Sequence, residues 1–230
     1  MKKFIAILVL SLLLSVKAYS SELIKIPSRV YILDIDVNGY KTITSNQDVK
    51  QDFKVLNEIW GKANIFWDLK KISKVKANVK YFKKNRSKME SMTRETFDSK
   101  FHINFWLTMF SPKTKKPISK KSINIYYIPK SFVGLAGRSL YLRKTLEQKQ
   151  KYNGFVIVSH NYDVKVNYKI KRRGAVIAHE LGHHMNLKHP KDWKNKSNPN
   201  IMGSAESAEF TKEQIQIVRS YSKYFLKAFK

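Results

Sequence analysis

Three histidines with unequal spacing constrain this chain more than any other feature of its sequence. His179 and His183 are four residues apart, and residues four apart on an α-helix lie one above the other on the same face. The two imidazoles can therefore approach one metal ion. Glu180, one residue round the helix, would reach the water on that ion rather than the ion itself. A catalytic zinc takes three protein ligands and keeps one open position, so a third ligand is required.

His189 can supply the third imidazole only if the helix ends soon after His183. In a continuous helix His189 would lie about 9 Å further along the axis than His183, at about 1.5 Å per residue. Asn186 lies between them, and asparagine is the commonest residue other than glycine in the left-handed conformation that ends helices. Pro190 disfavours helical backbone at His189. The sequence therefore predicts a turn near Asn186 that brings His189 back to the other two histidines.

Residues 200–203, Asn-Ile-Met-Gly, place a methionine in a predicted turn downstream. A His-Glu-x-x-His-x-x-x-x-x-His pattern followed by a methionine turn resembles the metzincin clan of zinc endopeptidases. Two positions depart from the usual pattern. Asn186 replaces a glycine, which is a mild change because both residues tolerate positive φ. Ser204 stands where some members carry a tyrosine that approaches the metal, so that feature is absent.

The resemblance implies a role for each residue of the motif. One catalytic zinc ion is held by three imidazoles, those of His179, His183 and His189. Glu180 is the general base, and Met202 forms an apolar floor under the histidines without binding the metal. The implied activity is the hydrolysis of peptide bonds in a protein or peptide substrate.

Two alternatives remain open at this point. Other zinc peptidases take their third ligand from a glutamate on a later helix, and Glu206 or Glu209 would suit that role, although His189 would then have none. A rival of a different class is a non-catalytic, basic, zinc-containing binding or adhesion protein of the cell envelope. Such a site has no need of Glu180 and tends to close its coordination with a fourth protein ligand.

The remaining histidines have no partner that the sequence identifies. His184 lies off the metal-facing side of the helix, and we expect it at the surface. For His102 and His160 we expect structural roles.

The amino terminus predicts a signal peptide. Two lysines precede a short apolar run over residues 4–16, and the Ala-Tyr-Ser at 18–20 places small residues where a signal peptidase cuts. The run is too short for a stable membrane span, and the alternative is an uncleaved anchor. We expect residues 1–20 to be removed and residues 21–230 to form one metzincin-like zinc peptidase domain. The product would be a monomer without a transmembrane segment, secreted or periplasmic in a bacterial cell.

The charge of the chain is strongly positive, with 45 Lys and Arg against 17 Asp and Glu. A field of this size draws anionic surfaces non-specifically, such as membranes, polysaccharides and nucleic acid. For any single cluster we prefer the alternative, a lysine bias on solvated faces. Sequence-specific nucleic-acid binding is not expected, because no reader motif is recognised. The absence of cysteine excludes disulfides.

Hydrophobic periodicity predicts an α+β fold. The expected strands cover residues 29–37, 75–81, 123–128, 133–142 and 155–159, and the expected helices cover 48–64, the motif from about 173, and a last segment capped by Thr211 and Gln214. Residues 93–110 fit either a helix or a strand. This order is also the metzincin order, which implies a zincin-like catalytic domain. Its twisted mixed sheet of about five strands would accompany an active-site helix and two further main helices. The strand near 134–140 would be the edge strand that lines the cleft, or else a surface hairpin.

Overall fold

The structure is a computed structural model that describes part of the chain. The described residues are 22–91, 99–110, 119, 121–129, 137–140, 155–159, 171–192, 200–203 and 209–229. The predicted signal peptide at residues 1–20 lies outside these ranges. Within them, no helix combines the length and the apolar character that crossing a membrane requires.

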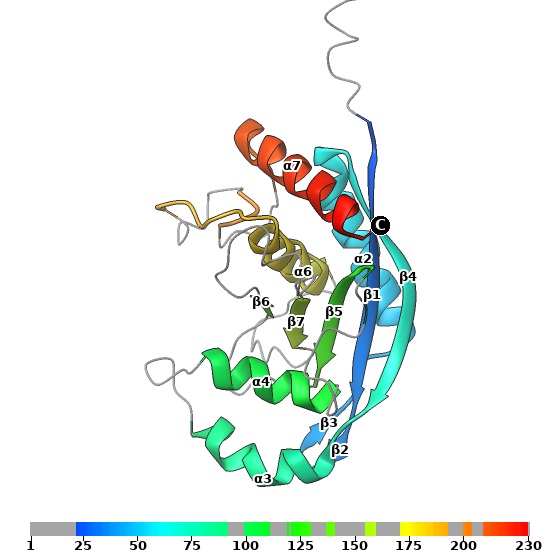
Figure 1. The fold of residues 1–230 in the computed structure, drawn as a ribbon, viewed down its shortest axis with the longest axis vertical. Helices are drawn as coiled ribbons and strands as arrows, with labels where there is room; N and C mark the ends of the chain where they lie inside the picture. Colours follow the sequence, from blue (N-terminus) through cyan, green and yellow to red (C-terminus); the bar gives the residue numbers. More distant parts are fainter. Residues whose placement is uncertain are drawn as a thin grey trace, which may run out of the picture.

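A five-stranded mixed sheet forms the centre of the fold (Figure 1). The strands lie in the order β4-β1-β5-β7-β6, and all neighbours are parallel except β6, which runs antiparallel to β7 at one edge. Their bounds are β1 (Ile24–Asp34), β4 (Ile65–Lys76), β5 (Ile123–Ile128), β6 (Gly137–Leu140) and β7 (Phe155–Ser159). The predicted α+β fold with a mixed sheet of about five strands is confirmed, and the strand predicted at 133–142 lies at the sheet edge.

Both faces of this sheet are buried. Successive side chains of a strand point to opposite faces, so one strand can contribute to two cores. Ile26, Val30 and Ile32 of β1 belong to one hydrophobic core, whereas Tyr31 and Leu33 belong to a second. The first core includes side chains of α2 (Asn46–Trp60), α6 (Lys171–His184) and α7 (Lys212–Ala228). The second includes side chains of α3 (Val79–Glu90) and α4 (Ser99–Phe110). Parallel strands that are buried in this way form near-continuous apolar runs, as β5 does.

A two-residue hairpin follows the first strand. β1 is followed by a short antiparallel pair, β2 (Asp36–Val37) and β3 (Tyr40–Lys41). Asn38 and Gly39 join the pair with φ of 49° and 79°. Positive φ at both central residues is what a two-residue hairpin of this kind requires.

The helix predicted at residues 48–64 and the predicted last helix are both present, and each starts at a capping box. α2 starts at a capping box formed by Ser45 and Asp48, and a short 3-10 turn, η1 (Gly61–Ala63), continues it toward the predicted end. α7 starts at the predicted capping box, in which the Thr211 hydroxyl accepts from the Gln214 amide.

The strand predicted at residues 75–81 is wrong in position. β4 ends at Lys76, and α3 begins at Val79 with Asn78 as its N-cap, whose side chain accepts from the amide of Tyr81 at 3.1 Å. Apolar residues alternate with polar ones, mostly lysine, from the end of the strand into the first turn of the helix, so the alternation conceals the boundary. The ambiguous segment 93–110 contains helix α4, and its residues 93–98 lie outside the described part.

Candidate metal centre

Helix α6 ends at the turn that the sequence predicts. Asn186 has a φ of 70°, in the left-handed region. The amide of Asn186 donates to the carbonyl of His183, and the amide of Leu187 donates to that of Gly182, each at 2.9 Å. These two bonds define a Schellman motif, which satisfies the last carbonyls of a helix and turns the chain away. The turn allows His189 to return toward α6.

The three histidines form one cluster. Their candidate ligand nitrogens all lie within 4.8 Å of one another, and the Nε2 atoms of His183 and His189 are 3.1 Å apart. Each Nδ1 atom faces a backbone carbonyl. The pairs are His179 with Ile201 at 2.8 Å, His183 with Leu187 at 3.0 Å and His189 with Met202 at 2.8 Å.

These carbonyls decide which ring nitrogen carries the proton. A carbonyl oxygen only accepts, so each Nδ1 must donate and each neutral ring keeps its lone pair on Nε2. Two such lone pairs 3.1 Å apart repel each other unless a cation lies between them. Two nitrogens bound to one tetrahedral zinc at about 2.05 Å would lie about 3.3 Å apart. The donor set therefore fits a zinc ion, with the ring orientation held by backbone carbonyls as in known metal sites.

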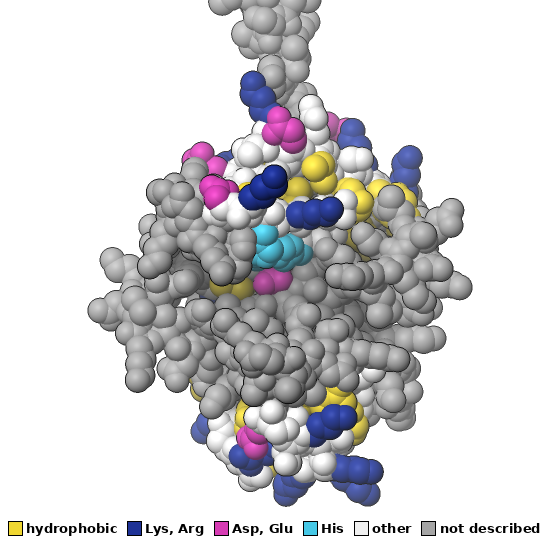
Figure 2. Space-filling view, turned by 90° about the vertical axis from the view of Figure 1, so that its left-hand side faces the viewer, with side chains coloured by type: hydrophobic (Ala, Val, Ile, Leu, Met, Phe, Trp, Pro, Cys, Tyr) yellow, Lys and Arg dark blue, Asp and Glu magenta, His cyan; other side chains and the backbone are white. Residues whose placement is uncertain are grey.

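Electrostatics favour the uncharged form of the buried rings. Burial lowers the pKa of His179 to about 4, with a smaller contribution from the neighbouring histidines. Burial also lowers the pKa of His183. Metal binding requires neutral imidazoles, so protons do not compete strongly at these two rings near pH 7. His189 is exposed, and Figure 2 shows histidine side chains visible from outside the molecule.

Met202 lies directly against the motif helix. It is fully buried. A β-carbon built on Gly182 would lie only 2.5 Å from the Met202 sulfur, so the sulfur occupies the space that this glycine leaves open. Gly182 belongs to the helical turn between His179 and His183. The methionine therefore packs on the backbone that carries two of the three histidines.

Replacing Met202 tests whether this side chain acts through the volume it fills or by binding the metal. We expect Met202→Leu to reduce stability by less than about 1.5 kcal/mol, because the volume is similar, and to leave zinc bound. Met202→Ala should reduce stability by about 2 to 5 kcal/mol, because it leaves a cavity next to Gly182. Thermal unfolding together with metal analysis tests both. Loss of zinc in the leucine variant at unchanged stability would mean that the sulfur itself is a ligand.

The methionine turn is tied to helix α7 through two side chains. The Asn200 Oδ1 atom accepts from the amide of Met202 at 2.8 Å and from Nε2 of Gln214 at 3.0 Å. Gln214 is also the third helical residue of the α7 capping box with Thr211. One glutamine side chain therefore fixes both the start of α7 and the turn that carries Met202.

The other candidate residues separate into three groups. Glu180 is 9% exposed and directly follows His179 on α6, and it is not one of the clustered ligands. Glu209 is exposed and forms an ion pair with Lys62 at 3.6 Å, outside the cluster, which disfavours it as the third ligand. Glu206 and His160 lie outside the described residues, as does the side chain of His102.

The prediction that His184 lies at the surface is wrong. The side chain is 3% exposed and stacks on the ring of Phe225, with centroids 5.0 Å apart and planes at 20°. Phe225 belongs to α7. His184 therefore joins the motif helix to the last helix.

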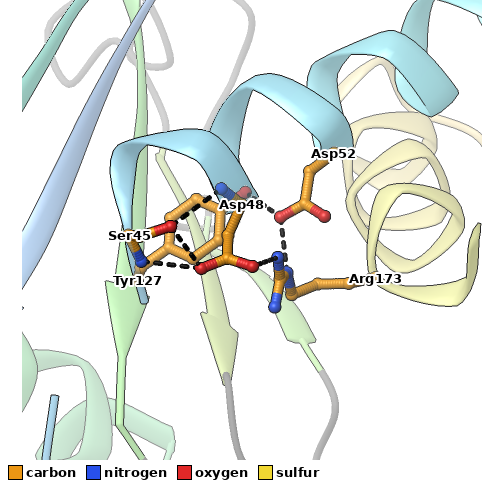
Figure 3. Close-up of polar contacts among 5 residues, drawn as sticks. All are labelled: Ser45, Asp48, Asp52, Tyr127 and Arg173. Atoms are coloured by element: carbon orange, nitrogen blue, oxygen red, sulfur yellow. Dashed lines mark hydrogen bonds and ion pairs between the residues drawn. The ribbon is translucent and has the colours of Figure 1, made fainter. Parts of the chain in front are cut away.

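A buried ionic network, which the sequence analysis missed, anchors the other end of the motif helix (Figure 3). Nε of Arg173, in the first turn of α6, donates to the Asp52 carboxylate, which also accepts from the Tyr127 hydroxyl at 2.7 Å. Arg173 also lies 3.4 Å from Asp48. Burial raises the pKa of Asp52, and the Arg173 guanidinium opposes that rise. The network joins α6 to α2 and to strand β5.

The sequence did contain a signal for Asp52. It falls between Val49 and Leu56 on the apolar stripe of the predicted helix, where a carboxylate needs a buried partner. Next to the network, a β-carbon on Gly174 would lie 2.6 Å from the β-carbon of Val55. That β-carbon would also lie 2.8 Å from the backbone oxygen of Asp52, so helices α6 and α2 pack closely at Gly174, beside the network.

Removing the Arg173 charge should destabilise the fold strongly. Arg173→Met leaves the Asp52 carboxylate buried without its cation, and breaking such a pair typically reduces stability by about 3 to 5 kcal/mol. The double variant Asp52→Asn/Arg173→Met removes both charges and should recover a large part of this loss. Denaturant unfolding of both single variants and the double variant measures the coupling. Additive effects would show that the two groups do not interact energetically.

Comparison with known proteins supports the fold assignment. No protein-family model matches the chain, and neither does any curated protein. Among solved structures it is similar to a promirolysin mutant from Tannerella forsythia, a metzincin-type metallopeptidase, with a TM-score of 0.58 and 15% identity over 91% of this chain and 86% of that one. It is also similar to one chain of a chaperone–substrate complex (TM-score 0.49, 11% identity, 89% of this chain and 36% of that one). A third similar structure is metalloproteinase-II from Bacteroides fragilis (TM-score 0.46, 8% identity, 88% of this chain and 55% of that one).

The first of these similarities carries the fold argument. At 15% identity it shows a shared architecture, and the histidine motif is an independent observation in the same chain. The chain therefore resembles the metzincins in its fold as well as in its motif.

Proposed function

We propose that the chain is an exported, zinc-dependent endopeptidase. The observation that carries this proposal is the convergence of three Nε2 atoms whose rings are each oriented by a backbone carbonyl. The shared fold with a metzincin-type metallopeptidase supports it. When bound, a zinc ion lowers the pKa of a coordinated water from about 15.7 to near 7 and polarises the scissile carbonyl.

Each residue of the motif would have a distinct role in the reaction. His179, His183 and His189 hold the ion as neutral imidazoles. Glu180 accepts a proton from the attacking water on its carboxylate and later delivers that proton to the leaving amine. Its position directly after His179, with a side chain only 9% exposed, suits proton transfer in a site shielded from bulk water.

Strand β6 is the proposed docking edge for the substrate backbone. Among the strands that the structure describes it is the last of the sheet, it pairs with β7 on one side, and it lies beside α6. An extended peptide can add to such an edge through main-chain hydrogen bonds, with little dependence on its side chains. A protein or peptide substrate would then lie in extended form next to the histidines.

The rival function is a non-catalytic, basic, zinc-containing binding protein. Structural zinc sites are usually closed by four protein ligands. Among the residues that the structure describes, no fourth His, Cys, Asp or Glu joins the three histidines. The exposure of His189 also leaves one side of the cluster accessible, which favours the enzyme.

The test uses the purified chain without residues 1–20, assayed on casein, gelatin and a peptide library. We expect about one zinc per chain and cleavage that stops on chelation and returns with added zinc. Zinc binding without cleavage of any substrate would support the rival. Cleavage that persists after complete removal of the metal would refute the zinc mechanism. The positions cut in the library would define the specificity.

A further inference from the structure

Helix α3 presents a face made of lysines. The lysines of this helix are exposed, whereas Phe82 and Met89 are buried in the second core. At about 100° per residue the four lysines fall within an arc of about 140°, directly opposite these two buried side chains. The members of this α3 lysine face are Lys80, Lys83, Lys84 and Lys88.

The charge of this face is not neutralised by its own helix. The one acidic residue of α3, Glu90, accepts from the Tyr40 hydroxyl at 3.0 Å and from Nε of Arg86 at 2.7 Å. Within the described part of the chain, no ion pair involves a lysine of the α3 face. The positive charge also extends into the preceding strand through Lys74 and Lys76, which are exposed.

The α3 lysine face lies at one extremity of the molecule. In Figure 1, α3 is at the end opposite α7. Figure 2 shows Lys and Arg side chains at that same end, away from the exposed histidines, and others at the opposite end. A partner bound there would leave the histidine cluster accessible.

We propose that the α3 lysine face docks the protein on an anionic lipid surface. The face is the outer side of a helix at an extremity of the molecule, so it is convex and does not line a groove. Lys88 also lies over the ring of Phe101 of α4, 4.2 Å from its centroid, at one border of the face. Single-stranded nucleic acid is held in a basic groove with aromatic side chains that stack on the bases, and the exposed positions of α3 carry no aromatic residue. Val79, which is 38% exposed at the start of the helix, adds an apolar contact.

Lysine chemistry agrees with this partner. A lysine ammonium is a compact point charge with no fixed geometry, whereas arginine is suited to bidentate recognition of single phosphates. A membrane offers many phosphates in a plane and requires no register. Arg86, the only arginine on α3, is instead engaged by Glu90 and lies over the Tyr40 ring.

The test is co-sedimentation with vesicles of phosphatidylcholine, alone or mixed two to one with phosphatidylglycerol. We expect binding to the mixed vesicles only. One lysine near an anionic surface contributes about fivefold in affinity, so replacing all four α3 lysines by glutamine should weaken binding by a hundredfold or more. Vesicle co-sedimentation requires neither zinc nor peptidase activity, so the docking proposal can fail or succeed independently of the proposed function.

The matched control removes the same number of lysine charges from other helices. Replacing Lys50 and Lys54 on α2 and Lys223 and Lys227 on α7 by glutamine alters net charge equally, and all four are exposed. This control should keep most of the vesicle affinity. Equal loss in both variants would overturn the proposal in favour of overall charge. Undiminished binding by the α3 variant would also overturn it. So would stronger binding of wild type to single-stranded DNA than to the vesicles at the same salt concentration, with that binding lost in the α3 variant.

Discussion

Replacement of Glu180 by glutamine should lower peptidase activity by several orders of magnitude while leaving the fold and the zinc content unchanged. Glutamine has the shape of glutamate but cannot accept the proton of the attacking water. Loss of a general base typically lowers the rate by about 10² to 10⁴-fold. The measurement is kcat/KM on a fluorogenic peptide cut by the wild type, with metal analysis of the same preparations. Because Glu180 is not one of the clustered ligands, about one zinc per chain should remain.

A second glutamate serves as the control for this experiment. Glu209 is exposed and paired with Lys62, so Glu209→Gln should retain nearly full activity and zinc. If Glu180→Gln and wild type cleave every tested peptide equally fast, Glu180 has no role in hydrolysis. A wild type that cleaves nothing would favour the non-catalytic zinc protein.

The geometry of the motif was predictable because its causes are local. Two histidines on one helix face, an asparagine suited to positive φ and a proline after His189 together determine where α6 ends and where the chain turns. The structure places Asn186 at a φ of 70° and closes the turn with two backbone hydrogen bonds. None of this depends on packing by distant segments, so one sequence was sufficient.

Features set by distant segments were not predictable in the same way. His184 has the spacing of a surface residue on α6, and only the later helix α7 buries it against Phe225. The partners of Asp52 come from β5 and α6, and the residues of its closest ion pair are 121 positions apart in the sequence. Periodicity within one segment contains no information about which partner covers it.

The predicted strand boundaries were wrong for a different reason, because the local sequence pattern fits more than one structure. β1 begins at Ile24, five residues before the predicted start. The prediction missed these residues because Pro27 and Ser28 interrupt the apolar alternation of the strand. Asn78 starts α3 as an N-cap, but the apolar residues on both sides of it keep the spacing of a strand. In both places the side chains fit two structures, and hydrogen bonds to neighbouring segments select one.

Replacement of His189 by alanine should remove the zinc without unfolding the protein. His189 is exposed, and its contacts include that of its Nδ1 with the Met202 carbonyl and the packing of its ring near His179 and His183. Loss of one such hydrogen bond usually reduces stability by about 0.5 to 1.5 kcal/mol. The metal-free variant should therefore melt close to metal-free wild type, and only wild type should gain stability from added zinc.

The same measurement decides between the two candidate third ligands. Glu209→Gln and Glu206→Gln are the matched variants, and both should retain about one zinc per chain and the stabilisation by added metal. Full zinc affinity in His189→Ala together with its loss in either glutamine variant would establish the later-glutamate ligand. The described geometry favours His189, because its Nε2 lies 3.1 Å from that of His183, whereas the Glu209 carboxylate lies 3.6 Å from Lys62 and outside the cluster. A carboxylate that already neutralises a lysine would have to leave that partner to bind the metal, while His189 is already in place.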